Sequence, residues 1–382
     1  MAYQSNINAS DLFEQLLSKG LEGLPQLLSS IINEAMKLER SHYLAAESYE
    51  RTPDRMSYSN GFKPKTLKTR VGELKLSVPQ TRDSKFYPSL LERGMRSERA
   101  LAVSVAEMYF QGISTRKVKA VMEELCGFEI TSTQVSHCAK QLDDEFKAWR
   151  ERPLGSYRFV YLDAIYEKIR YEGCVQSCAV LIAIGINEEG YRDVLGLSVE
   201  LSEAEIHWRE FLQTLQARGL HGTQLFISDA HSGLKAARQA VFPSIPWQRC
   251  HFHLAQNAQH YVTKKADAKK VGRIIRNILM ASSLQEAQQR LFQAIKDLED
   301  MPKLVKWMET NILEGFAHFS FEENYHRYIR TSNMLERLNK EIRRRTKKIG
   351  VFPNTLSCER LISAVLIEQA DEWITAKKYL VL

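Results

Sequence analysis

The chain has 382 residues, 44% of them hydrophobic and 26% charged, which suits two or three globular domains and excludes an intrinsically disordered chain. No apolar run approaches the ~18 residues of a membrane span, the N-terminal sequence lacks a signal-peptide pattern, and the six cysteines include no Cys-x-x-Cys pair, so we expect a reducing, cytoplasmic compartment. The net charge of +7 is concentrated in residues 51–99, with 12 Lys and Arg against 5 Asp and Glu, and in residues 331–348, with 7 against 2, which indicates either contacts with phosphates or solvated faces.

Residues 1–50 are predicted to form a helical segment that serves dimerisation or DNA binding. Apolar residues recur at near-helical spacing over residues 12–38, and Gly20 and Pro25 divide this run into two helices. Because so small a unit cannot bury its own apolar stripe, we expect it to pack on a partner or on its own copy.

Residues 51–98 are predicted to form a basic β-ribbon. A basic stretch over residues 60–70 is followed, over residues 71–79, by the apolar and polar alternation of a half-buried strand. Such a ribbon could lie along DNA or be a solvated hairpin. The cations expected on its exposed side are Lys65, Lys68, Arg70 and Lys75.

Residues 99–152 are predicted to contain a helix-turn-helix that binds DNA, although most helical hairpins bind nothing. Ser114 can cap a first helix, Gly127 ends it, and Thr131 or Ser132 caps a second helix. The stripes expected to be buried are Val118, Val121 and Leu125 on the first helix, and Val135, Ala139, Leu142 and Phe146 on the second. The outward residues expected to contact DNA are Gln134, His137 and Lys140.

Residues 153–253 have the element order of the first part of a ribonuclease-H-like catalytic core. Three strand patterns on short turns predict an antiparallel meander, and a capping box at Ser202-Glu203-Ala204-Glu205 opens the helix that follows. Two shorter strands with a helix between them complete the order β-β-β-α-β-α-β. The strand patterns cover residues 157–170, 177–186, 191–201, 225–229 and 246–250.

The rest of the chain is predicted to be helical. Residues 254–330 would form an all-helical insertion, and residues 331–382 the last helices of the catalytic core. The expected fold class is therefore α/β, with a mixed five-stranded sheet interrupted by this insertion and preceded by the helical and helix-turn-helix-like segments.

Two aspartates stand at central strands of the predicted sheet. By alternation Asp163 shares a face with large apolar residues, where a carboxylate is costly unless it is neutralised, hydrogen-bonded or bound to a cation. Asp229 ends a buried strand, where ligand sites of α/β sheets gather. Both could converge on a divalent metal such as Mg²⁺, which takes oxygen ligands. The alternatives are a helix N-cap for Asp229 and a strand residue satisfied by tyrosine or lysine for Asp163.

Glu336 is the candidate third acid. Residues 331–348 predict a helix whose buried stripe adjoins a face that begins with Glu336 and continues with cations. Glu336 either completes a metal site while the cations hold DNA phosphates, or forms a surface ion pair with Lys340. The cations of this face are Lys340, Arg343 and Lys347.

Cys250 and His253 form a Cys-x-x-His pattern, which alone is a weak zinc signature because a structural zinc site needs four ligands. The alternative is a packed cysteine with a hydrogen-bonding histidine.

The insertion carries a basic segment. Aliphatic residues form the buried stripe of residues 263–280, so the basic side chains should face outward and contact phosphates. Trp307 is expected either in the core or stacked on a flipped base. The cations expected to bind DNA are Lys269, Lys270 and Arg273.

Four motifs, in order along nearly the whole chain, resemble those of the bacterial Mutator-type insertion-sequence transposases. They read DAIYEKIR at residues 163–170, SDAHSGL at residues 228–234, WQRCHFH at residues 247–253 and RTSNMLERLNKEIRRRTKKIGVFP at residues 330–353. The sequence departs from the family at Gln256-Asn257, where the family has Arg-Asn, and at Pro79-Gln80-Thr81-Arg82, where it has Pro-Arg-x-Arg. Both departures weaken phosphate contacts and neither touches the acids.

The resemblance implies a DDE transposase that binds the terminal inverted repeats of its element and target DNA, then cleaves and transfers strands. Asp163, Asp229 and Glu336 would be its triad and would hold two Mg²⁺ or Mn²⁺ ions per active site. Cys250 and His253 match the Cys-x-x-His of the family. We expect a homodimer in the bacterial cytoplasm, associated with the nucleoid. The alternatives are a catalytically inactive, domesticated transposase that acts as a DNA-binding regulator, and a nuclease of related fold that does not join strands.

Overall fold

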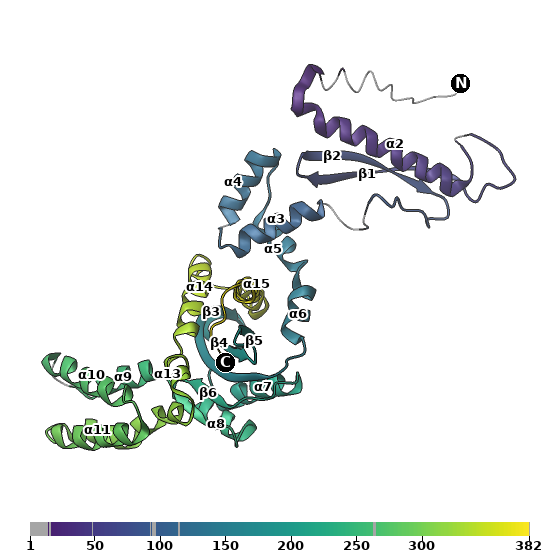
Figure 1. Ribbon diagram of the computed structural model, residues 1–382. Coiled ribbons are helices and arrows are strands. Elements are labelled where there is room, and N and C mark those ends of the chain that lie inside the picture. The colour runs from purple at the N-terminus through teal and green to yellow at the C-terminus, as the bar shows by residue number, and fades with distance from the viewer. Residues whose placement is uncertain are drawn as a thin grey trace. The chain divides into compact units, whose positions relative to one another are not determined.

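The computed structural model describes residues 14, 17–47, 49–91, 93, 97–113, 115–262 and 265–381. The chain divides after Leu142 into two compact units (Figure 1). In the part of the chain so described, no helix combines the length and the apolar character needed to cross a membrane.

The first unit begins with a helix packed on a β-ribbon. The short helix η1 (Gly20–Gly23) precedes α2 (Leu24–Leu44), which has a proline in its first turn, as the predicted break requires. α2 packs on β2 (Gly72–Thr81), which pairs antiparallel with β1 (Ser59–Thr69). The ribbon of the same chain therefore covers this helix. The residues buried between them include Met36, Leu74, Leu76 and Val78.

The strand register corrects the prediction for one ribbon lysine. Lys65 lies opposite Leu76, and directly opposed residues share a face, so Lys65 lies on the face that α2 covers. It is half-buried, and its Nζ donates to the Tyr87 hydroxyl at 2.9 Å. Lys68 and Lys75 lie on the opposite face, where Lys75 is exposed. Arg70 follows β1, is exposed and forms an ion pair with Glu98.

Three helices complete the first unit: α3 (Arg99–Phe110), α4 (Thr115–Cys126) and α5 (Ser132–Lys140). Thr131 is the N-cap of α5, as predicted, and forms a capping box with Gln134. The predicted stripe of α4 is wrong in part, because Val118 is buried whereas Val121 and Leu125 are exposed. Met122, one turn after Val118, is buried instead, so the stripe runs on another side of the helix. Ser114 lies outside the described residues.

The second predicted helix of this region is interrupted. α5 ends at Lys140, and α6 (Asp143–Glu151) begins a new helix in the second unit. The first turn of α6 is acidic, which favours a helix N-terminus at that point because the helix dipole is positive there. The residues Val135 and Phe146 therefore belong to two helices rather than to one stripe.

The second unit is built on a mixed five-stranded sheet, as predicted. Its order is β5-β4-β3-β6-β7, antiparallel across β5, β4 and β3 and parallel across β3, β6 and β7. The strands are β3 (Tyr157–Tyr171), β4 (Cys174–Asn187), β5 (Arg192–Glu200), β6 (Leu225–Ser228) and β7 (Trp247–Arg249).

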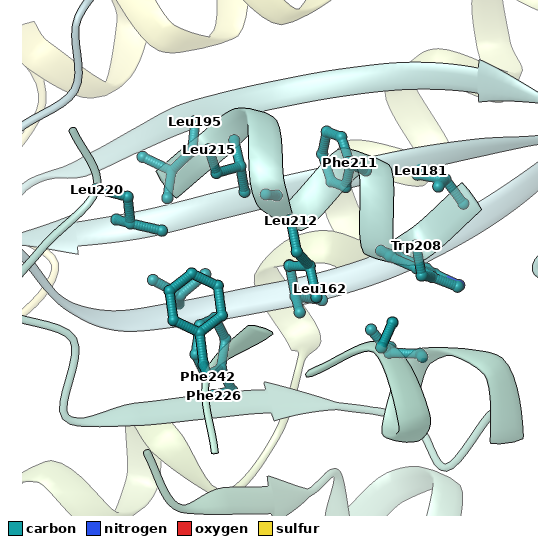
Figure 2. Packing of buried hydrophobic residues seen from close by; sticks show 14 of the residues in the cluster. Leu162, Leu181, Leu195, Trp208, Phe211, Leu212, Leu215, Leu220, Phe226 and Phe242 are labelled. Carbon is teal, nitrogen blue, oxygen red and sulfur yellow. The ribbon is translucent and has the colours of Figure 1, made fainter. Parts of the chain in front are cut away.

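Helices α7 (Glu205–Ala217) and α8 (Ser232–Val241) cover one face of this sheet. Figure 2 shows their core, in which Trp208 and Phe211 of α7 lie over Leu162 and Leu181 of the strands. The predicted capping box of α7 is wrong. The helix begins at Glu205 after an N-cap alanine, and Glu205 pairs with Arg209 one turn ahead instead of reaching back.

The insertion has a hydrophobic core of its own. Trp307 is 7% exposed within this core, which confirms the prediction that its ring belongs to the core. The helices of the insertion are α9 (His251–Gln259), α10 (Lys265–Leu279), α11 (Leu284–Asp297), α12 (Pro302–Asn311), η2 (Ile312–Gly315), η3 (Ala317–Ser320) and α13 (Glu323–Ile329). The chain then returns to the sheet in α14 (Asn333–Thr346) and α15 (Thr355–Thr375).

Candidate active site

Strand register places Asp163 and Asp229 beside each other. β3 and β6 are parallel neighbours in which Tyr161 pairs with Ile227, and each aspartate comes two residues further along its strand. Asp229 follows β6 directly, and its Oδ1 accepts a hydrogen bond from the His231 N–H at 3.2 Å. The two carboxylates therefore meet where β6 ends, on the central pair of the sheet.

The electrostatics of the pair favour a positive ligand. Burial and the neighbouring Asp229 carboxylate raise the pKa of Asp163 to about 6, although a hydrogen bond from Asn339 and the charge of His253 act against the rise. Asp163 is half-buried. Two carboxylates held close together in a partly buried site repel one another, and a cation between them would relieve that repulsion.

Helix α14 brings a third set of oxygen atoms toward Asp163. The Nδ2 of Asn339 donates to the Asp163 Oδ2 at 2.8 Å. Glu336 lies three residues earlier, on the same side of the helix. The Oε1 of Glu336 and the Oδ1 of Asn339 are buried, and neither has a hydrogen-bond partner in the described part of the chain. No ion pair between Glu336 and Lys340 is found there either, so the surface-pair alternative gains no support.

The three acids do not form a closed cluster. Among the residues that the structure describes, no three His, Cys, Asp or Glu side chains are grouped closely enough to hold a metal ion. Asp163 and Asp229 interact electrostatically, whereas Glu336 is related to them through Asn339. The chemistry of these carboxylate and amide oxygens fits a hard divalent cation, and the unpartnered Glu336 oxygen fits a missing ligand contact.

Cys250 joins the segment of Asp229 to the helix of Glu336. Its backbone N–H donates to the Ser228 carbonyl at 2.8 Å, and its Sγ accepts from the Ser332 N–H at 3.4 Å and the Ser332 hydroxyl at 3.2 Å. Ser332 is the N-cap of α14, and its hydroxyl bonds to the sulfur instead of to the helix. Cys250 is fully buried at this junction.

His253 completes a packed thiol–imidazole pair with Cys250. The interaction with the Cys250 side chain raises the pKa of His253 to about 9; burial opposes this rise, and the charges of Cys250, Asp163 and Asp229 reinforce it. Burial raises the pKa of the Cys250 thiol, but His253 and Ser332 outweigh it and hold that pKa below its ordinary value. The Cys250 side chain and the two aspartates thus favour the protonated form of His253.

The predicted cations lie on exposed helix faces. Lys340 and Arg343 are exposed on α14, Lys347 is exposed at its C-cap, and Leu335, Leu338 and Ile342 form the buried stripe of the helix, as expected. On α10 the exposed residues Lys269, Lys270 and Arg273 lie opposite buried Val271, Ile275 and Ile278. In the first unit Gln134, His137 and Lys140 are exposed on α5. Gln134 is also engaged in the capping box, since its Oε1 accepts from the Thr131 N–H at 2.9 Å.

Sequence reasoning missed Asn339, Ser332 and Glu203. Asn339 could have been found from its spacing of three residues after Glu336. Burial and the Asp229 charge raise the pKa of Glu203, with His231 acting against them, so this acid also borders the pair. No sequence signal marks Glu203 or Ser332, because each reaches the site from a loop beside a helix start.

Comparisons with known proteins agree with these motifs. A family model described as "Transposase, Mutator family" matches residues 4–376. The transposase for insertion sequence element IS406 of Burkholderia multivorans is 52% identical over 372 residues, which cover 96% of each chain. The transposase for ISRM5 of Rhizobium meliloti is 40% identical, over 97% of this chain and 94% of the relative. The transposase for IS256 in transposon Tn4001 of Staphylococcus aureus is 39% identical, over 93% and 92%.

A solved chain of a simian T-cell lymphotropic virus intasome shows only a weak likeness. It shares 11% identity over 53% of this chain and 65% of that chain, with a TM-score of 0.19. A score this low carries no argument about fold.

Proposed function

The chain belongs to the Mutator family of transposases, and from this premise we propose that it is a DDE transposase with a ribonuclease-H-like catalytic core. It binds the terminal inverted repeats of its own insertion sequence and catalyses metal-dependent strand cleavage and strand transfer. Asp163, Asp229 and Glu336 are its catalytic acids. The protein acts as a homodimer on DNA in the cytoplasm, at the nucleoid.

The observation that carries this proposal is the pairing of Asp163, within β3, with Asp229, directly after the parallel neighbour β6, with the α14 oxygens on the side of Asp163. The raised pKa of Asp163 and the unpartnered Glu336 Oε1 both indicate that a positive ligand belongs there. The acids would hold Mg²⁺ or Mn²⁺, two ions per site. Such ions stabilise the attacking and leaving oxygens of a phosphoryl transfer.

The side chains of this protein have separate tasks in the reaction. Asn339 holds the Asp163 carboxylate in one orientation, and Cys250 fixes the start of α14 so that Glu336 faces the strands. Water attacks a phosphodiester at the element end and releases a 3′-hydroxyl. That hydroxyl then attacks a target phosphodiester and expels a new 3′-oxygen. The chain needs no nucleophilic side chain for either step.

DNA is held by exposed cations in both units. In the first unit α5 contacts the terminal repeat through Gln134, His137 and Lys140, with its basic residues on phosphates and its polar tips on base edges. The cations of α14 and its C-cap, and those of α10, hold phosphates near the cut. These are Lys340, Arg343 and Lys347, and Lys269, Lys270 and Arg273.

The test is cleavage of a labelled duplex that carries the terminal repeat found beside the gene. With Mg²⁺ the wild-type protein should cut this duplex and join it to a target. Asp163→Asn, Asp229→Asn and Glu336→Gln should each lower cleavage by about 10²-fold or more, because each removes a carboxylate that would hold the metal ions on which cleavage depends. Binding in EDTA should be unchanged, since it depends on Lys and Arg.

Glu341→Gln is the matched control, because Glu341 lies on α14 but forms an ion pair with Arg344. It should cut like the wild type. Near-normal cleavage by any of the three amide variants contradicts the triad assignment. A wild-type protein that binds the repeat and never cuts it would instead be a DNA-binding regulator.

A further inference from the structure

A groove of about 630 Å³ lies in the insertion between α9 and α10, which pack side by side (Figure 1). α9 contributes Phe252, Gln256 and Gln259, and α10 contributes three cations. These cations are Lys269, Arg273 and Arg276, and no acidic side chain lines the groove in the part of the chain described. The walls therefore suit a ligand with flat apolar faces, polar edges and negative charge close by.

Gly272 keeps the α10 wall of this groove free of a side chain. Glycine inside a helix is destabilising relative to alanine. The backbone does not require it, because its φ lies outside the left-handed region. Packing does not require it either, since an added Cβ would meet only the Gln259 Nε2, at 3.4 Å. What the missing side chain provides is the open space of the groove.

The groove adjoins the candidate active site. Phe252 is 49% exposed, and its ring centroid lies 5.5 Å from that of His253, at an interplanar angle of 70°. The charges of Asp163 and Asp229 in turn act on His253. The groove therefore begins at the residue next to the histidine on which the two aspartates act.

We propose that the groove binds an unpaired base of the DNA strand next to the phosphate that is cut. Phe252 stacks on the base, Gln256 and Gln259 hydrogen-bond its edge, and the α10 cations hold the flanking phosphates. The inference rests on the proposed function, which places a DNA strand at Asp163 and Asp229. The basic walls and the exposed aromatic ring favour a nucleotide over an acidic peptide, which has no flat face to stack.

The test measures binding of the full-length protein, in EDTA, to paired repeat duplexes and to duplexes with one mismatched base at successive positions around the cut. Unpairing a base costs free energy that a mismatch has already removed. The wild type should therefore bind a mismatch at one or two positions about tenfold more tightly than the paired duplex. Phe252→Ala and the groove-filling Gly272→Leu should each abolish this gain.

Phe292→Ala is the control, because Phe292 is also an exposed aromatic of the insertion, 61% exposed on α11 with the Lys296 ammonium 4.3 Å from its ring centroid. It should keep the full gain. A wild type without a mismatch gain, or a gain that survives in both groove variants, overturns the base-binding inference and leaves the groove to a protein partner. Absence of repeat binding and cleavage in the wild type would refute the proposed function itself, which separates the two failures.

Discussion

Asp163 illustrates, at the scale of one residue, how a functional site costs stability. Its carboxyl has a pKa of about 6 in the folded protein against 3.8 in the unfolded chain. Between these values the folded state binds more protons, so stability falls as pH rises from about 4 to 6 and stays lower above pH 6. The charge that would bind a cation is thus the charge that destabilises the cation-free protein.

We therefore predict that Asp163→Asn stabilises the protein in EDTA. At pH 7.5 its free energy of unfolding should exceed that of the wild type by about 1–3 kcal/mol, since one pKa unit corresponds to about 1.4 kcal/mol. At pH 4 the difference should nearly vanish, because wild-type Asp163 is then largely protonated when folded. Urea denaturation at both pH values measures this. Equal stability at pH 7.5, or a difference independent of pH, would show that Asp163 carries no such cost.

At the scale of elements, the sequence allowed the strands and the two strand aspartates to be predicted, because alternation and buried apolar runs report local burial. The register of the β-ribbon was not predictable, and Lys65 accordingly lies on the opposite face from the expected one. The acidic first turn of α6 and the Glu205–Arg209 pair in α7 are local features, but the apolar spacing and the capping-box pattern pointed to other helix bounds. The Asn339–Asp163 hydrogen bond joins positions 176 residues apart, which no local pattern reports.

Cys250 offers a test of how α14 is positioned. Cys250→Ala leaves the N–H and hydroxyl of buried Ser332 without their acceptor, so we expect a loss of about 1–3 kcal/mol in stability. Mn²⁺ affinity should fall about tenfold or more, as for other groups that orient ligands. Cys250→Ser keeps a hydrogen-bond acceptor, so it should recover most of the lost stability and most of the lost Mn²⁺ affinity. Paramagnetic titration measures the Mn²⁺ affinity, and urea denaturation measures the stability. Unchanged Mn²⁺ affinity in the alanine variant would make Cys250 a packing residue only.

Two kinds of substitution on helix α5 distinguish a loss of DNA contacts from a loss of helix stability. Gln134→Ala should weaken repeat binding and also cost about 0.5–2 kcal/mol, because Gln134 is half of the Thr131 capping box. The double variant of His137→Ala and Lys140→Ala should weaken repeat binding and leave stability unchanged, since both side chains are exposed. Anisotropy against repeat and scrambled duplexes measures the sequence preference. Equal affinity of the wild type for both duplexes would show that α5 does not read the repeat.

At the scale of the whole molecule, positive charge is divided among separate elements instead of forming one basic domain. The cations of α10 belong to an insertion with its own core, so they can be changed without disturbing the sheet. This independence lets one ask whether the insertion holds DNA or only separates two parts of the catalytic core.

Reversing Lys269, Lys270 and Arg273 to Glu should lower cleavage and reduce the slope of log affinity against log salt by about 2–3, because each duplex phosphate contact contributes about 0.9. The matched control reverses Lys296, Lys303 and Lys306, which are exposed on α11 and α12 of the same insertion, so the net charge changes equally. If binding follows local contacts, the control keeps the wild-type slope and cleavage. If total charge alone matters, both triple variants lose affinity together, and the placement of DNA on α10 is wrong. Wild-type cleavage and an unchanged slope in the α10 variant would reduce the insertion to a structural spacer.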